Sequence, residues 1–443
     1  MTRCEGVPLV GVSLTSGWLA WLLVLLGLAG AVLLLARRER WWWLFILPLV
    51  VMVSAVAAWV IGEPVATNLF AEPLPPVIMC WIGVGIAGIS LAVGSLFRIG
   101  WVRSAGAVIA GTVVVTLAAN QINTFYAQYP TLGDVLGVAS DQQITGPPAL
   151  GSAATSTPLA VAPEPLTTVW TPTGTGMPAD GKGRVSPVDL PGVRSGFQGR
   201  TGWVYYPPAY FADNPQPLPV LVLLAGQPGD PHDWLLGDRL PSVMNDFAAQ
   251  HNGLAPVVVV PDALGSEMAN PICADSSLGR VDTYLSQDVP DAIRAQLRVD
   301  PNPRHWVIGG FSYGGTCALQ MVTNHPTVYP SFVDISGQLE PTLGSRKQTV
   351  DTAFGGDESK FTAINPIDIM GRAKFPTIAG WFIVGSQDSA VDSDLQRVKS
   401  AAQSAGMNVL YWQSAGSAHD WTTAAAGLAH AMPWMGHRMN ITA

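Results

Sequence analysis

The sequence predicts two parts of different kinds: an all-α anchor of four transmembrane helices, followed by an α/β domain with a mainly parallel sheet covered by helices. The 443 residues are 49% hydrophobic and only 12% charged, about half the charged fraction of an ordinary soluble protein. The mean hydropathy is +0.30. Beyond residue 187, short β-rich runs alternate with helical ones, a pattern typical of a parallel sheet in a separate domain.

Four long apolar stretches account for the high hydropathy, and all of them lie in the first 126 residues. They cover residues 15–36, 41–62, 75–97 and 104–126. Each is close to the roughly 20 residues that a helix needs to cross the hydrocarbon core of a bilayer. The first stretch is too long for a signal peptide and ends at a basic cluster, so we expect it to stay uncleaved. Residues 1–126 are therefore predicted to form the anchor.

The short loops between these stretches predict how the chain lies in the plasma membrane. Arg37, Arg38 and Arg40 follow the first stretch, and Arg98 and Arg103 lie between the third and fourth, whereas the loop between the second and third has no Lys or Arg. The positive-inside rule places the arginine loops in the cytoplasm and the rest of the chain outside it. The stretches carry almost no ionisable residues of the kind that mark a transport path, so we expect a multi-pass anchor in contact with membrane lipids.

Residues 127–186 are rich in Pro, Thr, Ala, Gly and Ser. Such a composition buries little apolar surface, so we expect an extended tether here. The net charge of −8 and the lack of any Lys/Arg run argue against nucleic acid as a partner, because phosphate binding needs clustered basic residues.

Residues 187–443 are predicted to form the α/β domain. Continuous apolar runs predict buried strands at 218–226, 255–263, 305–311, 331–337, 378–386 and 408–416. Helical periodicity appears between them, for instance at 288–299 and 393–406. The carboxyl ends of these strands form the edge where α/β proteins assemble their sites.

The stretch "GGFSYGG" at 309–315 contains the pattern Gly-x-Ser-x-Gly centred on Ser312. The pattern alone does not separate a nucleophile from a serine in a tight turn. Here a buried strand precedes Ser312 and a helix follows it, which is the position of the nucleophile elbow in α/β-hydrolases. Gly310 and Gly314 remove side chains that would clash in that turn. We therefore predict that Ser312 is a nucleophile.

The elbow requires an acid and a base later in the chain, in the order Ser, Asp or Glu, His. His419, in "GSAHDW", follows the last predicted strand, whereas the other histidines have weaker positions: His232, His251, His305, His325, His430 and His437. Asp388 lies just past the preceding strand, so its carboxylate can accept a hydrogen bond from Nδ1 of His419. Asp392 is the alternative acid, with a helix N-cap as its structural role. Asp394 is expected to be a solvated helix residue.

An oxyanion hole needs two backbone N–H groups. Tyr313, directly after the serine, is predicted to supply one, and the loop "AGQPGDPHDW" at 225–234 the other. Gly226 and Gln227 are placed to supply the second, and we favour the N–H of Gln227. Gly226 and Trp421 are expected to contact the substrate.

No metal or cofactor is predicted. Asp230, His232 and Asp233 lie close together, but no ligand set of known spacing accompanies them, so a loop-stabilising role is the preferred interpretation. The four cysteines show no Cys-x-x-Cys spacing. Cys273 and Cys317 would pair if their domain lies in an oxidising compartment, and buried free thiols are the alternative.

Four motifs carry a resemblance to a known family. They are "GWVYYPPAYF" (202–211), "PVLVLLAGQPG" (219–229), "GGFSYGGTCAL" (309–319) and "SAHDW" (417–421). With them, residues 190–437 resemble the putative-esterase family of α/β-hydrolases, which includes esterase D, feruloyl esterases and actinobacterial mycolyltransferases. The amino-terminal half, including "INTFYAQYPTLGDVLG" (122–137), is similar to that of membrane-bound actinobacterial members. The resemblance implies a triad of Ser312, Asp388 and His419.

Together these features predict a membrane-anchored, extracytoplasmic serine esterase that cleaves acyl or lipid esters through an acyl-enzyme. If the acyl group passes to a sugar or lipid hydroxyl instead of water, the protein is an acyltransferase acting on envelope glycolipids. A non-catalytic hydrolase-like domain that binds an envelope component is a further alternative. The segment 342–366 is predicted to contribute a cap over the substrate pocket.

Overall fold

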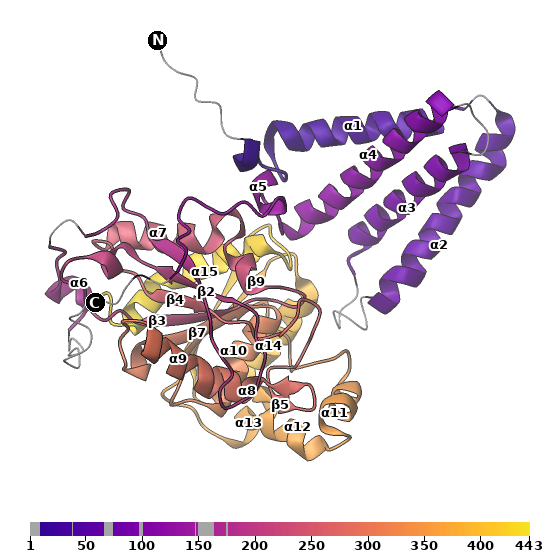
Figure 1. Ribbon diagram of the computed structural model, residues 1–443. Helices are drawn as coiled ribbons and strands as arrows, with labels where there is room; N and C mark the ends of the chain where they lie inside the picture. The colour runs from indigo at the N-terminus through magenta and orange to yellow at the C-terminus, as the bar shows by residue number, and fades with distance from the viewer. Residues whose placement is uncertain are drawn as a thin grey trace, which may run out of the picture. The chain divides into compact units, whose positions relative to one another are not determined.

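The computed structural model describes residues 9–37, 39–65, 74–96, 101–146, 148, 164–173 and 176–443. The chain divides into two compact units, Met1–Ala139 and Ser140–Ala443, and each is described by itself (Figure 1).

The first unit contains four helices that are long and apolar enough to cross a membrane. They are α1 (Gly17–Leu35), α2 (Leu47–Val65) with the π-helical turn η2 (Trp42–Ile46) before it, α3 (Pro76–Leu96) and α4 (Trp101–Tyr126). The predicted four-helix part is confirmed. Small residues let the helices approach closely: a Cβ added at Gly111 of α4 would lie 2.7 Å from the Cβ of Ala92 on α3. Such contacts are typical of helix packing in membranes.

The segments before α1 and after α4 are hydrogen-bonded to each other. The Leu14 N–H donates to the Pro130 carbonyl (2.8 Å), and the Leu132 N–H donates to the Val12 carbonyl (3.0 Å). The buried side chain of Asn120 donates through Nδ2 to the Leu14 carbonyl (3.0 Å). Both ends of the bundle therefore lie at the same end of its helices, as an even number of spans requires.

The structure differs from the expected tether at both ends of 127–186. Residues next to α4 form the short helix α5 (Leu132–Val135), which belongs to the first unit. Leu166 and Trp170, in and after α6 (Leu166–Val169), are 6% and 4% exposed. Strand β1 (Arg184–Val188) starts within the expected tether and joins the sheet. These apolar residues are scattered among Pro and Thr, so an averaged composition hides them. Residues 149–163 lie outside the described part of the chain.

The second unit is built on an eight-stranded sheet of order β1-β2-β4-β3-β7-β8-β9-β10. The strands are β1, β2 (Gly202–Tyr206), β3 (Val220–Leu224), β4 (Val257–Val260), β7 (Trp306–Phe311), β8 (Ser331–Ile335), β9 (Ala379–Gly385) and β10 (Asn408–Ser414). The six predicted strands are parallel to one another, and β2 pairs antiparallel with both β1 and β4. The α/β-hydrolase fold is confirmed.

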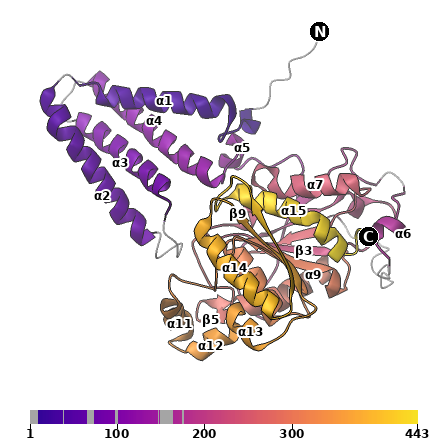
Figure 2. The same cartoon turned by 180° about the vertical axis from the view of Figure 1, so that it is seen from behind.

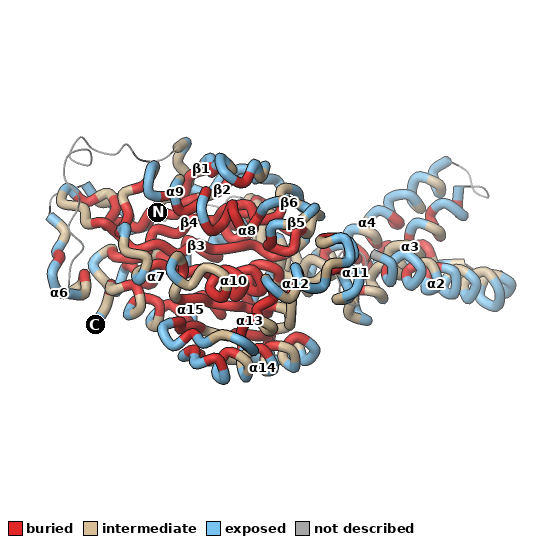
Figure 3. The backbone as a smooth tube through the Cα atoms, turned by 90° about the horizontal axis from the view of Figure 1, so that it is seen from below, coloured by how far each residue is buried: buried red, intermediate tan, exposed pale blue. Residues whose placement is uncertain are grey.

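Helices cover both faces of the sheet. Helices α7 (Arg239–Gln250) and α15 (Trp421–Arg438) lie on one face, and α9 (Val289–Gln296), α10 (Tyr313–Asn324) and α14 (Ser389–Ser404) on the other (Figures 1 and 2). Every residue of the central strands β3, β4, β7 and β8 is buried, and Figure 3 shows β3 and β4 in red. Strand β10 was expected to be buried, but exposed residues interrupt it, because it is an edge strand with a single neighbour.

An excursion at residues 263–283 lies between β4 and α9. It contains the hairpin β5 (Asp275–Ser276) and β6 (Gly279–Arg280) and the turn α8 (Val281–Thr283). It packs against the segment expected to cap the pocket, which forms helices α11 (Arg346–Phe354) and α12 (Glu358–Ile364) and leads into α13 (Pro366–Arg372). Arg346 of α11 forms ion pairs of 2.7–2.9 Å with Glu340, Glu358 and Asp368, and so joins the cap segment to the residues on both sides of it.

Candidate active site

Ser312 occupies a strained turn between β7 and α10. Its backbone angles are φ 56° and ψ −117°, in a region that favours glycine. The surroundings hold this conformation: the Ser312 N–H donates to the Ile335 carbonyl (2.8 Å), and the Ser312 carbonyl accepts from the N–H of Gly315 (2.9 Å). A strained residue at the carboxyl end of a central strand is the arrangement expected of a nucleophile elbow.

The two glycines of the Gly-x-Ser-x-Gly pattern are needed because the backbone is crowded at this turn. A Cβ at Gly310 would overlap the backbone of Gly314, and a Cβ at Gly314 would overlap the Leu224 carbonyl. The spacing of the pattern therefore follows from the close approach of β3, β7 and α10.

His419 and Asp388 meet at the same edge of the sheet. His419 Nδ1 lies 2.8 Å from Asp388 Oδ2, and the two side chains are 24% and 11% exposed. The loops that carry them are joined, since the Gln387 N–H donates to the Ser417 carbonyl (2.9 Å). With Nδ1–H donated to the carboxylate, Nε2 is the ring nitrogen left to accept a proton.

The His419 loop also lies against the elbow. The imidazole is 5.1 Å from the ring of Phe311, the residue before Ser312. Asp420 holds the loop in place, because its carboxylate accepts from the N–H groups of Ala418 (3.0 Å) and Thr423 (2.9 Å) and so caps α15. The predicted serine, imidazole and carboxylate are thus on adjoining loops.

The alternative acids have other partners. Asp392 accepts from the Tyr411 hydroxyl (2.5 Å) and from Gln413 Nε2 (3.0 Å). Burial and the neighbouring Asp392 carboxylate together raise the pKa of Tyr411 to about 12. Asp394 forms a surface ion pair with Arg397 at 3.4 Å. The geometry therefore favours Asp388 as the partner of His419.

The loop predicted to hold the oxyanion runs beside Ser312. A Cβ added at Gly226 would lie 3.5 Å from the Cβ of Ser312. Gln227 follows, and its side-chain Nε2 donates to the Met268 carbonyl (3.2 Å). Tyr313 is the first residue of α10, so its N–H has no carbonyl partner within the helix. The predicted loop is therefore next to the elbow, and the assignment of the Tyr313 and Gln227 N–H groups to an oxyanion hole stays a prediction.

An ion pair that was not predicted from the sequence holds this loop. Arg200 binds Asp262 with Nε–Oδ2 and Nη2–Oδ1 distances of 2.8 and 2.9 Å, and Nη2 also donates to the Gly229 carbonyl (2.8 Å). Burial alone would raise the pKa of Asp262, but the hydrogen bonds from Arg200 and from the Leu264 N–H keep it below its usual value. Asp262 follows an apolar run, so its position at the end of a strand could have been predicted from the sequence. No local pattern in the sequence distinguishes Arg200.

The acidic residues of this loop stabilise it. The N–H of Asp230 donates to Asp233 Oδ2 (2.8 Å), and Asp230 Oδ1 accepts from the His232 N–H (2.8 Å). Asp230 Oδ2 also lies 2.9 Å from Arg200 Nη1. These contacts agree with the loop-stabilising interpretation.

Trp421, the other predicted substrate contact, lies in the core beside the elbow. The side chain is 6% exposed and packs on the rings of Trp234 (5.1 Å) and Phe311 (5.2 Å). The guanidinium of Arg239 lies 4.7 Å from the Trp421 ring centre. Trp421 therefore supports the elbow from within the core, and its predicted contact with substrate stays a prediction.

Asp334 is a buried acid beneath the elbow. It lies on β8, and a Cβ at Gly315 of α10 would overlap its carboxylate. Oδ1 accepts from the Gly337 N–H (2.8 Å), and Oδ2 has no hydrogen-bond partner among the described residues. Burial raises the pKa of Asp334 to about 7, so the folded protein holds this acid neutral under mildly acidic conditions.

We expect Asp334→Asn to flatten the dependence of stability on pH. Because the pKa of Asp334 in the folded protein lies above the usual aspartate value of 3.8, the folded state binds more protons than the unfolded state between pH 4 and about 7. Stability is then lost as the pH rises through this window, by up to roughly 1.4 kcal/mol per pH unit. Thermal unfolding at several pH values measures the slope, and equal slopes for wild type and variant would contradict the expectation.

Comparisons with known proteins agree with this architecture. Residues 198–432 match the family described as "Putative esterase". An uncharacterized protein of Corynebacterium glutamicum is 38% identical over 392 residues, which is 86% of each chain. An S-formylglutathione hydrolase from Agrobacterium tumefaciens is similar in structure, with a TM-score of 0.50 and 16% identity over 59% of this chain and 98% of that one. A ferulic acid esterase gives a TM-score of 0.48 and 17% identity over 58% and 99%.

Proposed function

Because the chain belongs to the Putative esterase family and is an enzyme of the serine hydrolase or acyltransferase type, we propose that it is a membrane-anchored serine esterase acting outside the cytoplasm. One observation carries the proposal: the hydrogen-bonded pair of His419 and Asp388 (2.8 Å) lies beside the strained Ser312 at one edge of the sheet.

The proposed reaction has two half-reactions, and the same groups act in both. His419 Nε2 takes the proton from Ser312 Oγ as the oxygen attacks the ester carbonyl, and the N–H groups of Tyr313 and Gln227 stabilise the oxyanion. When the tetrahedral intermediate collapses, the C–O bond to the alcohol breaks and the imidazolium protonates the leaving alkoxide. The second half-reaction repeats these steps with a new hydroxyl as nucleophile. Asp388 orients the imidazole and stabilises its charged form.

Three observations support the extracytoplasmic location. The arginines lie in the loops after the first and third spans, which the positive-inside rule assigns to the cytoplasm. The segments flanking the bundle are hydrogen-bonded to each other through Leu14 and Pro130, in agreement with four spans and both ends on one side. Cys273 and Cys317 form a disulfide, a bond that persists in oxidising compartments.

A reporter fusion tests this topology. Alkaline phosphatase fused after residue 160 is expected to be active, and the same enzyme fused after residue 40 is expected to be inactive, because alkaline phosphatase needs an oxidising compartment for its disulfides. Measuring both fusions in the same cells controls for expression. The opposite pattern would place the catalytic domain in the cytoplasm.

The second candidate is an acyltransferase that uses the hydroxyl of a sugar or lipid as acceptor. The four apolar helices favour it, because they would hold the domain close to lipid hydroxyls and so raise their effective concentration. The triad chemistry is the same for both candidates. They differ in whether water or another hydroxyl releases the acyl group.

Product identification separates the two. Purified full-length protein is incubated with short- and long-chain acyl esters, with and without a polyol such as trehalose, and the products are identified by mass spectrometry. An esterase is expected to release free acid in every reaction, whereas an acyltransferase forms the acylated polyol. The Ser312→Ala protein serves as the control. If neither product exceeds this control, the proposed function is wrong.

A further inference from the structure

The excursion at residues 263–283 connects three parts of the proposed site. Its start supports the oxyanion loop, since the Gly229 N–H donates to the Glu267 carbonyl (3.0 Å) and Gln227 Nε2 donates to the Met268 carbonyl (3.2 Å). Its middle is joined to α10, the helix that begins directly after Ser312. Its far side contacts the cap segment.

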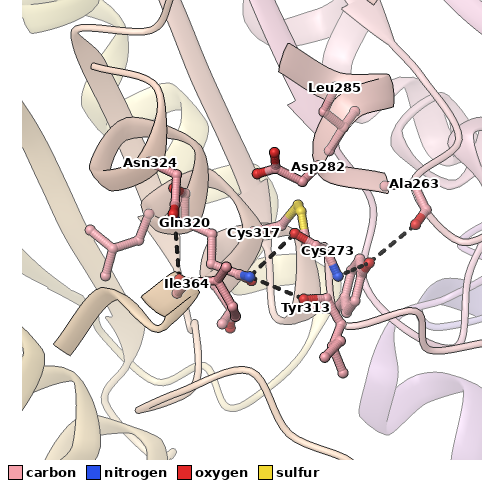
Figure 4. Close-up of a disulfide and its surroundings, with 12 residues drawn as sticks. Ala263, Cys273, Asp282, Leu285, Tyr313, Cys317, Gln320, Asn324 and Ile364 are labelled. Atoms are coloured by element: carbon pink, nitrogen blue, oxygen red, sulfur yellow. Dashed lines mark hydrogen bonds between the residues drawn. A yellow bond between two sulfur atoms is a disulfide. The ribbon is translucent and has the colours of Figure 1, made fainter. Parts of the chain in front are cut away.

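One face of α10 holds the middle of the excursion through three residues spaced one helical turn apart. Tyr313 accepts from the Cys273 N–H (3.0 Å) and donates to the Ala263 carbonyl (3.1 Å). Cys317 forms the disulfide with Cys273, with their Cα atoms 5.5 Å apart. Gln320 Nε2 donates to the Cys273 carbonyl (3.2 Å). Figure 4 shows these three side chains of α10 converging on Cys273.

The backbone at the point of attachment is strained. Ile272 and Cys273 have φ values of 51° and 52°, which are unfavourable for residues with a Cβ and worse for a β-branched one. Such a conformation persists only where the surrounding contacts hold it. Removing the contacts from α10 is therefore expected to let this segment relax to another conformation.

A movement of the excursion would also displace the cap segment, because the two are in contact. The Ser277 N–H donates to the Ala353 carbonyl (3.1 Å), and Asn270 Nδ2 donates to the Thr342 carbonyl (3.1 Å). Ile272 itself lies in a buried apolar cluster with Ala353 of α11. The strained residue is thus in direct contact with the cap segment.

We propose that residues 263–283 are a positioning element for the oxyanion loop and the cap, held in their active arrangement by the Cys273–Cys317 disulfide and the Tyr313 hydroxyl. This inference rests on the proposed function for its effect on turnover. Cys273, Cys317 and the Tyr313 side chain act through the backbone that they hold, so they are positioning residues. The backbone N–H of Tyr313 keeps its separate role in the oxyanion hole.

Two variants of the full-length protein test the inference. Tyr313→Phe removes both phenol hydrogen bonds but keeps the ring and the backbone N–H, and a Cys273→Ala, Cys317→Ala double variant removes the disulfide. Each is expected to lower kcat/KM by roughly 10- to 100-fold, the size of effect produced by small displacements of catalytic groups. Hydrogen exchange should become faster in 265–280 and 342–366, with no change in strand β2.

Tyr329→Phe is the matched control. Tyr329 is also a fully buried tyrosine, and its hydroxyl donates to the Leu285 carbonyl (2.8 Å) outside the excursion. Removing the Tyr329 hydroxyl is expected to reduce stability about as much as Tyr313→Phe does, and to leave kcat/KM within about 2-fold of wild type. If Tyr313→Phe and the double cysteine variant match Tyr329→Phe in both kinetics and exchange, the inference is wrong. If the wild-type protein fails to react with a fluorophosphonate, the proposed function is wrong. The hydrogen-exchange rates of the variants still test whether residues 263–283 are a positioning element.

Discussion

Replacing Ser312 with alanine is expected to abolish covalent labelling by a fluorophosphonate and to lower kcat by about 10⁴-fold or more. The reason is chemical: in the proposed reaction Ser312 Oγ forms the acyl-enzyme, and Ser312 lies in a strained turn (φ 56°) of the kind that exposes the nucleophile in α/β-hydrolases. His419→Ala is expected to cause a loss of similar size, because the serine hydroxyl is a weak nucleophile without a base. Gel-based labelling and steady-state kinetics with a short acyl ester measure both effects.

A serine and a histidine outside the proposed triad provide the controls. Ser400 is an exposed residue of α14 whose hydroxyl donates to the Gln396 carbonyl (2.8 Å), and His430 stacks on Trp412 at 4.1 Å. Ser400→Ala and His430→Ala are expected to label and turn over like wild type. Near-normal turnover by His419→Ala would refute the assignment of the base, and labelling of Ser312→Ala would place the nucleophile elsewhere.

Replacing Asp388 with asparagine is expected to lower kcat by roughly 10⁴-fold with little change in stability. The amide keeps the shape of the carboxylate, but it no longer stabilises the imidazolium and it favours the wrong tautomer of His419. The Nδ1–Oδ2 distance of 2.8 Å shows how directly the two groups interact. The measurement is kcat for an activated ester, together with thermal unfolding to show that the fold is intact.

Asp392→Asn is the matched control for this prediction. Asp392 lies in the first turn of α14, four residues after Asp388, but its partners are Tyr411 and Gln413. Its loss is expected to change kcat by no more than a few-fold. If Asp392→Asn were the inactive variant and Asp388→Asn the active one, the acid of the triad would be Asp392, and the hydrogen bond to His419 would have another role.

The triad could be proposed from the sequence because each of its residues follows an apolar run. In a parallel sheet the carboxyl ends of the strands lie along one edge, so strand order brings together residues as distant as 312 and 419. The choice between Asp388 and Asp392 was different. The sequence favours Asp388 because it lies just past a strand and keeps Asp392 as the alternative, whereas the side-chain direction that pairs Asp388 with His419 is seen only in the structure.

Contacts between distant segments account for the features that sequence patterns did not predict. Arg200 reaches Asp262 across 62 positions, and no local periodicity marks such a pair. Trp421 was expected to contact the substrate, and its ring packs on that of Trp234 within the core. Leu166 and Trp170 are buried in a segment whose average composition is that of a linker. Each of these outcomes depends on contacts with residues that are distant in the sequence.

The linear pattern by itself determined the four long apolar helices, the alternation that builds the sheet, and the Gly-x-Ser-x-Gly turn, because local hydrophobic period and glycine spacing dictate them. Tertiary structure alone decided that Cys273 and Cys317 pair, that Asp388 is the carboxylate facing His419, and that the excursion after β4 joins the oxyanion loop to the cap. Those outcomes require groups far apart in the chain to come within a few ångströms of each other, and that proximity is a property of the packed domain.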